Sequence, residues 1–305
     1  MKIASIDIGT NTVRCLISEV TDGILTPVSI YRNIIRLGEG FSENGRLEPA
    51  AIDRLTAVLA TYKGILLDSR CDRVRAVATS VMRDGDSDGS VRELLKDTLG
   101  YPVEVISGDE EARLTALGVR AGIRGLENGM VLDIGGGSTE LIRVHGNTNL
   151  WYTSLPAGVV HLTEELFLSD PPTVEQVKAF QARIRVLLDL QNEDGGVQLA
   201  GTAGTPTTLA AIHLGIDDYD PTLVNGHVLS LGKIKGLLEV FLAKTSAQRL
   251  AMRGMEKGRE DLIVAGTLMV LEVMDRWGYE DLIVSDWGLL EGIAIDLEKA
   301  VISNS

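Results

Sequence analysis

One short pattern occurs twice in this chain, far apart, and it constrains the fold more than any other feature. Asp7-Ile8-Gly9 and Asp133-Ile134-Gly135 lie 126 positions apart, and each ends an apolar run. Hydroxyl side chains and a second apolar run follow in both places, so a strand, a glycine turn and another strand are expected at each. A repeat at this distance predicts two similar halves that face one another.

The remaining segments alternate between strand-like and helix-like patterns. Helices are predicted where apolar residues recur at helical spacing, and strands where short apolar runs end in turn residues. The predicted strands cover residues 2–8, 13–20, 24–31, 74–79, 102–106 and 197–199, a strand–turn–strand unit covers 130–140, and helices cover 49–68, 90–99 and 108–122, with further helices within 172–191 and 230–250. This order predicts an α/β protein with mixed sheets.

Length and composition limit the classes of protein. A chain of 305 residues is longer than one hydrophobic core usually supports. We therefore predict two domains, 1–124 and 125–305, with the last helix, about 290–303, packing back on the first. The net charge of −14 disfavours broad nucleic-acid binding. Two cysteines allow no disulfide or zinc framework, and no apolar run is long enough to span a bilayer, so a cytoplasmic protein without membrane partners is expected.

The repeated glycine turns have the chemistry of phosphate loops. Glycine lets backbone N–H groups approach a phosphate closely, and neighbouring hydroxyl groups add further donors. The expected phosphate-binding residues are Gly9, Thr10, Asn11 and Thr12 in the first turn and Gly135, Gly136, Gly137 and Ser138 in the second. The preceding carboxylates, Asp7 and Asp133, are expected to hold Mg²⁺ or its waters. A single turn of this kind could equally be a simple hairpin connection, but two matching turns favour phosphate binding.

These turns and several other segments resemble the exopolyphosphatase and guanosine pentaphosphate phosphohydrolase family, which shares its fold with actin, sugar kinases and heat-shock chaperone ATPases. The further segments that carry the resemblance are residues 36–40, 78–83, 106–114, 154–160, 201–205 and 285–292. The resemblance runs from the first strand to the last helix. It implies two actin-like (ribonuclease H-like) domains, each with a mixed five-stranded sheet and flanking helices, and a cleft between them.

The resemblance also implies roles for three charged residues. Glu111 is expected to be the catalytic carboxylate that orients or activates water, and Glu140 to help position the water or the metal. Glu111 could instead stabilise a helix N-terminus, and Glu140 could be a solvated side chain. Arg83 is expected to bind phosphate, the alternative being a surface ion pair with Asp84 or Asp86.

This chain departs from the family pattern at three places that affect charge, one of which is His161, where the family commonly has arginine. An acidic stretch, Asp84 to Gly89, follows Arg83 where the family usually has alanine and asparagine, and Leu290 stands where arginine is frequent. The third glycine loop, Gly201 to Thr205, resembles the adenosine-side loop of the actin-like proteins and leaves a nucleotide ligand open.

The resemblance implies an exopolyphosphatase that uses Mg²⁺ and releases orthophosphate from the end of inorganic polyphosphate. Hydrolysis of guanosine pentaphosphate is the alternative substrate, since both reactions cut a terminal phosphoanhydride. Phosphate transfer to a small acceptor and a non-catalytic, actin-like nucleotide-binding module are more distant alternatives. A homodimer is compatible with folds of this kind, although nothing in the sequence selects it.

Overall fold

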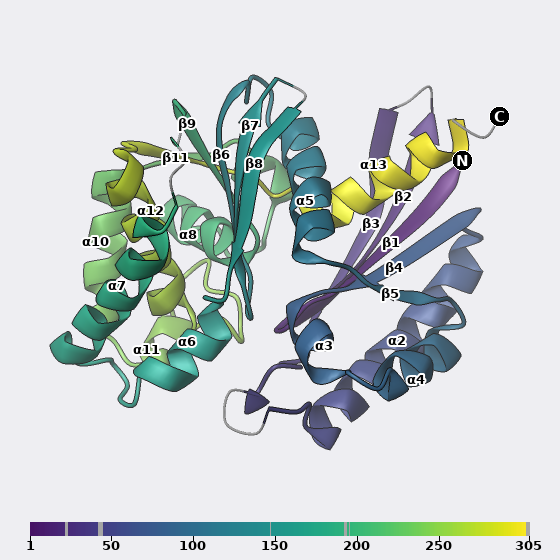
Figure 1. The fold of residues 1–305 in the computed structure, drawn as a ribbon, viewed down its shortest axis with the longest axis horizontal. Helices are drawn as coiled ribbons and strands as arrows, with labels where there is room; N and C mark the ends of the chain where they lie inside the picture. Colours follow the sequence, from purple (N-terminus) through teal and green to yellow (C-terminus); the bar gives the residue numbers. More distant parts are fainter. Residues whose placement is uncertain (22–23, 42–44, 147, 192–193, 195, 303–305) are drawn as a thin grey trace. The chain divides into compact units, whose positions relative to one another are not determined.

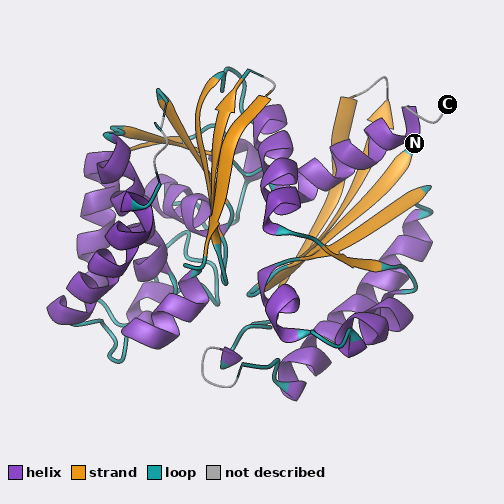
Figure 2. Ribbon diagram, in the orientation of Figure 1, coloured by secondary structure: helices purple, strands orange, loops and turns teal. Residues whose placement is uncertain are grey.

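The computed structural model describes residues 1–21, 24–41, 45–146, 148–191, 194 and 196–302. Residue 303, the expected last residue of the final helix, lies outside this described part. Contacts within the chain define two compact units, one formed by Met1–Gly118 with Leu289–Ser305 and the other by Val119–Gly288. Each unit contains one sheet and its own helices, as Figures 1 and 2 show.

The first unit contains a five-stranded sheet with the order β3-β2-β1-β4-β5. Its strands are β1 (Lys2–Ile8), β2 (Thr12–Thr21), β3 (Ile24–Ile34), β4 (Arg73–Ala78) and β5 (Val103–Val105). The first three form an antiparallel meander, and β4 and β5 extend the sheet in parallel from β1. The sheet is therefore mixed, as the sequence predicts.

Helices cover both faces of this sheet (Figure 1). They are α2 (Pro49–Ser69), α3 (Ser80–Gly85), α4 (Ser90–Leu99), α5 (Gly108–Gly122) and α13 (Leu289–Ile302). Helix α2 begins with Pro49 at a position where a missing N–H costs nothing, and buries Leu55 and Leu59 in the core of one face. On the other face, α13 buries Leu290 against β1 and β2. Leu290 is thus a core residue of the first unit.

The second unit contains a six-stranded sheet with the order β10-β11-β9-β6-β7-β8. Its strands are β6 (Asn128–Ile134), β7 (Thr139–His145), β8 (Thr148–Leu155), β9 (Gln198–Thr202), β10 (Val228–Ser230) and β11 (Asp281–Val284). Five strands were expected. The additional one, β10, has only three residues and pairs antiparallel with β11, so it is too short to produce an alternating pattern.

The helices of the second unit pack around one that is almost wholly buried. They are α6 (Val159–Leu166), α7 (Val174–Asp189), α8 (Gly204–Leu214), α9 (Pro221–Val224), α10 (Leu231–Leu242), α11 (Ser246–Leu250) and α12 (Ile263–Trp277). Every residue of α12 from Ile263 to Met274 is buried. A new helix starts at α11 because Thr245 and Gln248 form a capping box there. Among the described residues, no helix combines the length and the apolarity that a bilayer crossing requires.

The two sheets share a topology. In each, a meander of three antiparallel strands is extended by two parallel strands, β4 and β5 beside β1 in one unit and β9 and β11 beside β6 in the other. The repeat inferred from the two Asp-Ile-Gly segments is therefore present in the fold. Each Asp-Ile-Gly segment lies at the end of the first strand of its own unit.

Candidate active site

The two glycine turns have the same backbone geometry. The Gly9 N–H donates to the Thr12 carbonyl over 3.0 Å, and the Gly135 N–H donates to the Ser138 carbonyl over the same distance. Each turn joins two antiparallel strands and has two residues at its tip, Thr10-Asn11 in the first unit and Gly136-Gly137 in the second. The sequence repeat therefore extends to the strand pairing and to the hydrogen bond that closes each turn.

The first turn is held from behind by the chain that follows β3. The N–H groups of Ile35 and Arg36 donate to the Asn11 carbonyl over 2.9 and 3.0 Å, and the Gly38 N–H donates to the Thr10 carbonyl over 2.9 Å. These bonds fix the two carbonyl groups at the tip of the turn. The segment 36–40, which carries part of the family resemblance, therefore supports the turn through its backbone.

The side-chain amide of Asn11 is the unsatisfied group in this turn. Asn11 is 7% exposed, and within the described residues neither its Nδ2 nor its Oδ1 has a hydrogen-bond partner. Buried polar atoms in folded proteins nearly always have a partner, so an orphaned amide suggests a missing ligand or water. A phosphate oxygen would satisfy the Nδ2 donor, which agrees with the role expected from the sequence.

Asp7 lies directly across the β1–β2 ladder from Arg14. The Arg14 guanidinium donates to Asp7 Oδ2 from Nη2 over 2.6 Å and from Nε over 3.1 Å. Asp7 is 5% exposed, so its negative charge is balanced by an arginine in a largely buried site. Sequence reasoning did not single out Arg14, although it occupies the position in the first repeat that Glu140 occupies in the second.

Glu111 and Arg83 form an ion pair inside the first unit. Arg83 Nη1 lies 2.7 Å from Glu111 Oε2 and also donates to the Ile106 carbonyl over 3.0 Å. The structure thus places the expected catalytic carboxylate beside the expected phosphate-binding arginine, 28 positions apart in the chain. Arg83 pairs with Glu111 and not, as the alternative interpretation had it, with the neighbouring aspartates.

The adjacent Glu110 has a different environment. It binds Arg113 one helical turn away and also contacts Arg75, and the hydrogen bond from Arg113 lowers the pKa of its carboxyl. The Glu110 backbone N–H also donates to the hydroxyl oxygen of Ser107, which precedes α5. The helix-stabilising role that was the alternative for Glu111 therefore fits Glu110, whereas Glu111 is turned inward and is only 7% exposed.

The second turn is held by the start of α6. The Val159 N–H donates to the Gly135 carbonyl over 3.0 Å, and the Val160 N–H donates to the Gly136 carbonyl over 2.9 Å. Gly158 precedes these residues and lies so close to the turn that a Cβ on it would overlap the backbone of Gly136 and Gly137. The carbonyl groups are held on this side, and the backbone N–H groups at the tip make no backbone hydrogen bond within the described residues.

Two buried carboxylates face each other at the base of the second turn. Asp133 and Glu140 are direct cross-strand partners on β6 and β7, and they are 8% and 1% exposed. Glu140 Oε1 accepts a hydrogen bond from the Ser154 hydroxyl over 2.7 Å. Directly opposed residues in such a ladder have Cβ atoms about 5 Å apart, so the two carboxyl groups share one small region. The first turn has an aspartate and an arginine at the same two positions.

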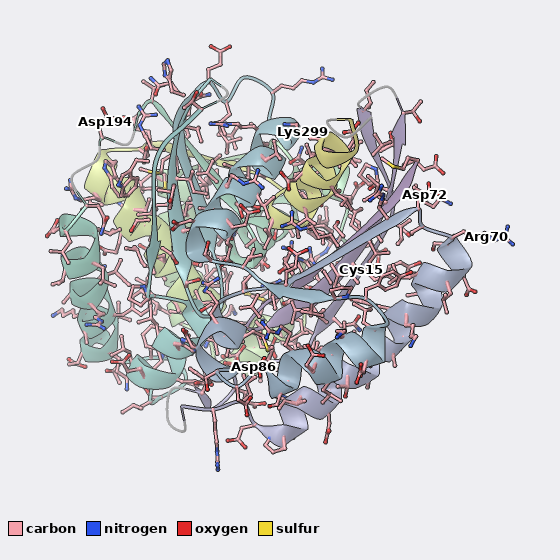
Figure 3. All side chains as sticks on the ribbon, turned by 45° about the vertical axis from the view of Figure 1, so that its right-hand side comes forward. Cys15, Arg70, Asp72, Asp86, Asp194 and Lys299 are labelled. Atoms are coloured by element: carbon pink, nitrogen blue, oxygen red, sulfur yellow. The ribbon has the colours of Figure 1, made fainter. Side chains whose placement is uncertain are left out.

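The acidic stretch after Arg83 caps a helix. Asp86 accepts the N–H groups of Val91 and Arg92 over 2.9 and 3.0 Å, and Figure 3 shows Asp86 beside the start of α4. Asp88 accepts the Ser90 N–H over 3.0 Å, and this backbone hydrogen bond lowers the pKa of its carboxyl. Negative charge at a helix N-terminus is stabilising, so these residues act on α4 and leave the pairing of Arg83 intact.

The third glycine loop connects β9 to α8. Ala203 has a positive φ of 66°, and the guanidinium of Arg259 lies over Gly204, where a Cβ would overlap it unless the arginine moved. The Thr202 hydroxyl donates to the Trp287 carbonyl over 3.0 Å. This loop is therefore bonded to Trp287, which lies in the segment 285–292, the last motif of the family resemblance.

The sequence and the fold of this chain are both similar to those of known proteins. The model of the Ppx/GppA phosphatase family matches residues 16–301. The chain is 35% identical to the protein named exopolyphosphatase 2 of Mycobacterium tuberculosis, over 97% of this chain and 98% of that protein. It is similar to the crystal structure of the Aquifex aeolicus family member, with a TM-score of 0.85 and 36% identity over 100% and 99% of the two chains. An exopolyphosphatase from Cytophaga hutchinsonii gives a TM-score of 0.88 and 26% identity over 98% of each chain.

Proposed function

The chain belongs to the Ppx/GppA phosphatase family, and from this we propose that it is an exopolyphosphatase, a hydrolase that removes the terminal phosphate of inorganic polyphosphate as orthophosphate. The name of the Mycobacterium tuberculosis relative supports this substrate. The observation that carries the proposal is the pair of glycine turns closed by the same backbone hydrogen bond, each preceded by a buried carboxylate. Such turns provide backbone and hydroxyl donors to a phosphate group without requiring a high overall positive charge.

Each turn would bind phosphate oxygens of the substrate. Backbone N–H groups at the turn tips are the main donors, and the orphaned Nδ2 of Asn11 is the clearest side-chain donor. Hydroxyl groups add to these donors. The residues assigned to phosphate binding are Gly9, Thr10, Asn11, Thr12, Gly135, Gly136, Gly137 and Ser138, together with Arg83.

Glu111 would orient the attacking water. Phosphoanhydride cleavage passes through a loose transition state, in which the protein mainly positions the water and stabilises charge. A carboxylate paired with an arginine is a weak base but a well-fixed hydrogen-bond acceptor, which suits the orienting role. Arg83 binds Glu111 through Nη1, and its Nη2 makes no hydrogen bond within the described residues, so Nη2 can donate to a phosphate oxygen.

The acidic residues fit a Mg²⁺ ion better in the second unit than in the first. Asp133 and Glu140 offer oxygen ligands from two neighbouring carboxylates, whereas Asp7 already balances the charge of Arg14. No cluster of three or more acidic, histidine or cysteine ligands occurs in the described part of the chain. Mg²⁺ usually keeps several water ligands and is bound by one or two carboxylates together with substrate phosphates. When bound, Mg²⁺ would neutralise phosphate charge and polarise the phosphoryl oxygen.

This difference between the turns gives a prediction for two matched variants. Asp133→Asn is expected to raise the Mg²⁺ concentration needed for half-maximal activity by about tenfold or more, because it removes one of two adjacent carboxylates. Asp7→Asn is expected to raise it less, because Asp7 is engaged by Arg14. Magnesium titrations of phosphate release by both variants check this. A larger shift for Asp7→Asn than for Asp133→Asn would show that the metal is held by the first unit.

Guanosine pentaphosphate is the second candidate substrate, since its terminal phosphate is also attached through a phosphoanhydride bond. The loop at Gly204 lies under the Arg259 guanidinium and does not by itself favour either substrate. The proposal is tested by measuring kcat/KM for polyphosphate and for guanosine pentaphosphate side by side with Mg²⁺ present. A higher kcat/KM for polyphosphate is expected. If only the nucleotide were turned over, guanosine pentaphosphate and not polyphosphate would be the substrate. If a phosphorylated acceptor appeared among the products, the reaction would be phosphate transfer and not hydrolysis.

A further inference from the structure

The second unit contains a cavity that lies apart from the candidate active site, since none of the site residues discussed above lines it. It has a volume of about 540 Å³ and lies where the end of α5 meets the start of β6 and the end of β7. Asn128, the first residue of β6, lines it, whereas Asp133 is five residues further along the same strand. Strands rise about 3.3 Å per residue, so the cavity lies roughly 16 Å from the carboxylate pair of the second turn.

Arg120 brings an unbalanced positive charge to this cavity. Its Nη2 donates to the backbone carbonyl of Thr148, its Nε is buried without a partner, and no carboxylate pairs with it among the described residues. Burial lowers the pKa of this guanidinium, because desolvation disfavours the charged form. A partly desolvated cation without a counter-charge is costly, and an anion in the cavity would offset that cost.

The other polar groups on the wall define the rest of the ligand. Arg124 is exposed and adds a second guanidinium, and His145 lies directly across the β6–β7 ladder from Asn128. The Oδ1 of Asn128 is buried and has no hydrogen-bond partner within the described residues. Glu127 is the acidic residue of the described lining, so guanidinium groups outnumber carboxylates there. The wall of the cavity therefore offers guanidinium groups that can bind an anionic group of a ligand, and one oxygen that can accept a hydrogen bond from it.

A simpler role for the arginines explains only part of this. Arg120 lies in the last turn of α5, where a positive side chain stabilises the negative end of the helix dipole. That role is served by an exposed side chain that reaches the last carbonyl groups. It explains neither the buried, unpartnered Nε of Arg120 nor the orphaned Oδ1 of Asn128, which lies on a different element.

We propose that this cavity binds a small phosphorylated organic molecule of the size of a nucleoside monophosphate. Its phosphate oxygens would bind Arg120 and Arg124, and a hydroxyl or amino group would donate to Asn128 Oδ1. A cavity of about 540 Å³ is within the range that holds ligands of this size. The ligand is separate from the substrate of the glycine turns, since the cavity lies at the opposite end of β6 from Asp133. The proposal does not depend on which phosphoanhydride the enzyme cleaves.

The test is calorimetric titration of the whole chain with adenosine monophosphate, guanosine monophosphate, glucose 6-phosphate and inorganic phosphate in separate experiments. We expect one molecule of at least one organic phosphate to bind per chain, and inorganic phosphate to bind at least about tenfold more weakly, because it cannot reach both the arginines and Asn128. Arg124→Ala, which changes an exposed side chain, is expected to weaken binding about tenfold. Arg183→Ala, which removes an exposed positive charge from α7 in the same unit, is the matched control and is expected to bind as the wild type does.

The Glu111→Gln variant separates this site from the catalytic residues. It is expected to bind the organic phosphate with unchanged affinity, whatever its hydrolytic activity. Absence of binding by the wild type at ligand concentrations up to about 5 mM would overturn the proposal. Binding that Arg124→Ala leaves unchanged, or that Glu111→Gln abolishes, would place the ligand elsewhere. Equal affinity for inorganic phosphate would refute the role of Asn128.

Discussion

Glu111→Gln is expected to lower the rate of orthophosphate release from polyphosphate by about 10³-fold, which is within the range that positioned acid–base groups contribute. The substitution keeps the shape of the side chain but removes its charge. It also leaves the guanidinium of Arg83 without its carboxylate partner, which lies 2.7 Å away in the wild type. Steady-state rates on medium-chain polyphosphate with Mg²⁺ measure the effect.

Glu110→Gln is the matched control, because it makes the same chemical change one residue earlier. Glu110 takes part in a network with Arg113 and Arg75, away from Arg83. Its loss is expected to reduce thermal stability slightly, since partly exposed ion pairs contribute little, and to leave the rate within about twofold of the wild type. Equal loss of activity in both variants would mean that the charge of the α5 start, and not Glu111 in particular, supports the reaction.

Gly158→Ala is expected to damage both stability and activity. A Cβ at this position would overlap the backbone of Gly136 and Gly137, and backbone atoms cannot rotate out of the way as a side chain can. Forcing an extra methyl group into such a contact costs about 1–3 kcal/mol. The second glycine turn would have to move, and displacement of a binding group by about 1 Å can lower a rate about 10²-fold. Thermal unfolding and steady-state rates measure the two effects.

Gly236→Ala in α10 is the control for this substitution. Gly236 is exposed, and a Cβ there would meet nothing within 4 Å. Because alanine is the better helix former, this variant is expected to gain roughly 0.5–1 kcal/mol of stability with unchanged activity. If Gly158→Ala retained full activity, the close contact between α6 and the second turn would have no part in holding the turn for phosphate binding.

The sequence predicts the regular elements well where the pattern is long. Helix α4 and helix α5 have the predicted ends, and β1 matches the predicted strand 2–8. The interval 230–250 contains two helices, because the capping box at Thr245 starts a second one. The three residues of β10 carry no alternation that could distinguish a strand from a loop, so the sixth strand was not predicted. Strand β8, although eight residues long, is likewise absent from the strands predicted by the local pattern.

The candidate site was predictable as a set of residues but not as a set of contacts. Both turns could be found because their residues are adjacent in the chain. The pairing of Glu111 with Arg83 joins segments 28 positions apart and depends on how α5 packs beside α3, which no local pattern records. Arg14 could have been found, since applying the 126-residue offset to Glu140 leads to it. That offset also shows that the two turns differ in charge, with an arginine facing Asp7 and a glutamate facing Asp133.

The proposed reaction is tested most directly by the products that the wild-type protein forms from medium-chain polyphosphate with Mg²⁺. Removal of terminal phosphates predicts that orthophosphate is the only small product and that it appears from the first time point, while the remaining chains shorten gradually. Chains cut into intermediate lengths without early orthophosphate, or no cleavage of polyphosphate at all, would contradict the assignment of this protein as an exopolyphosphatase.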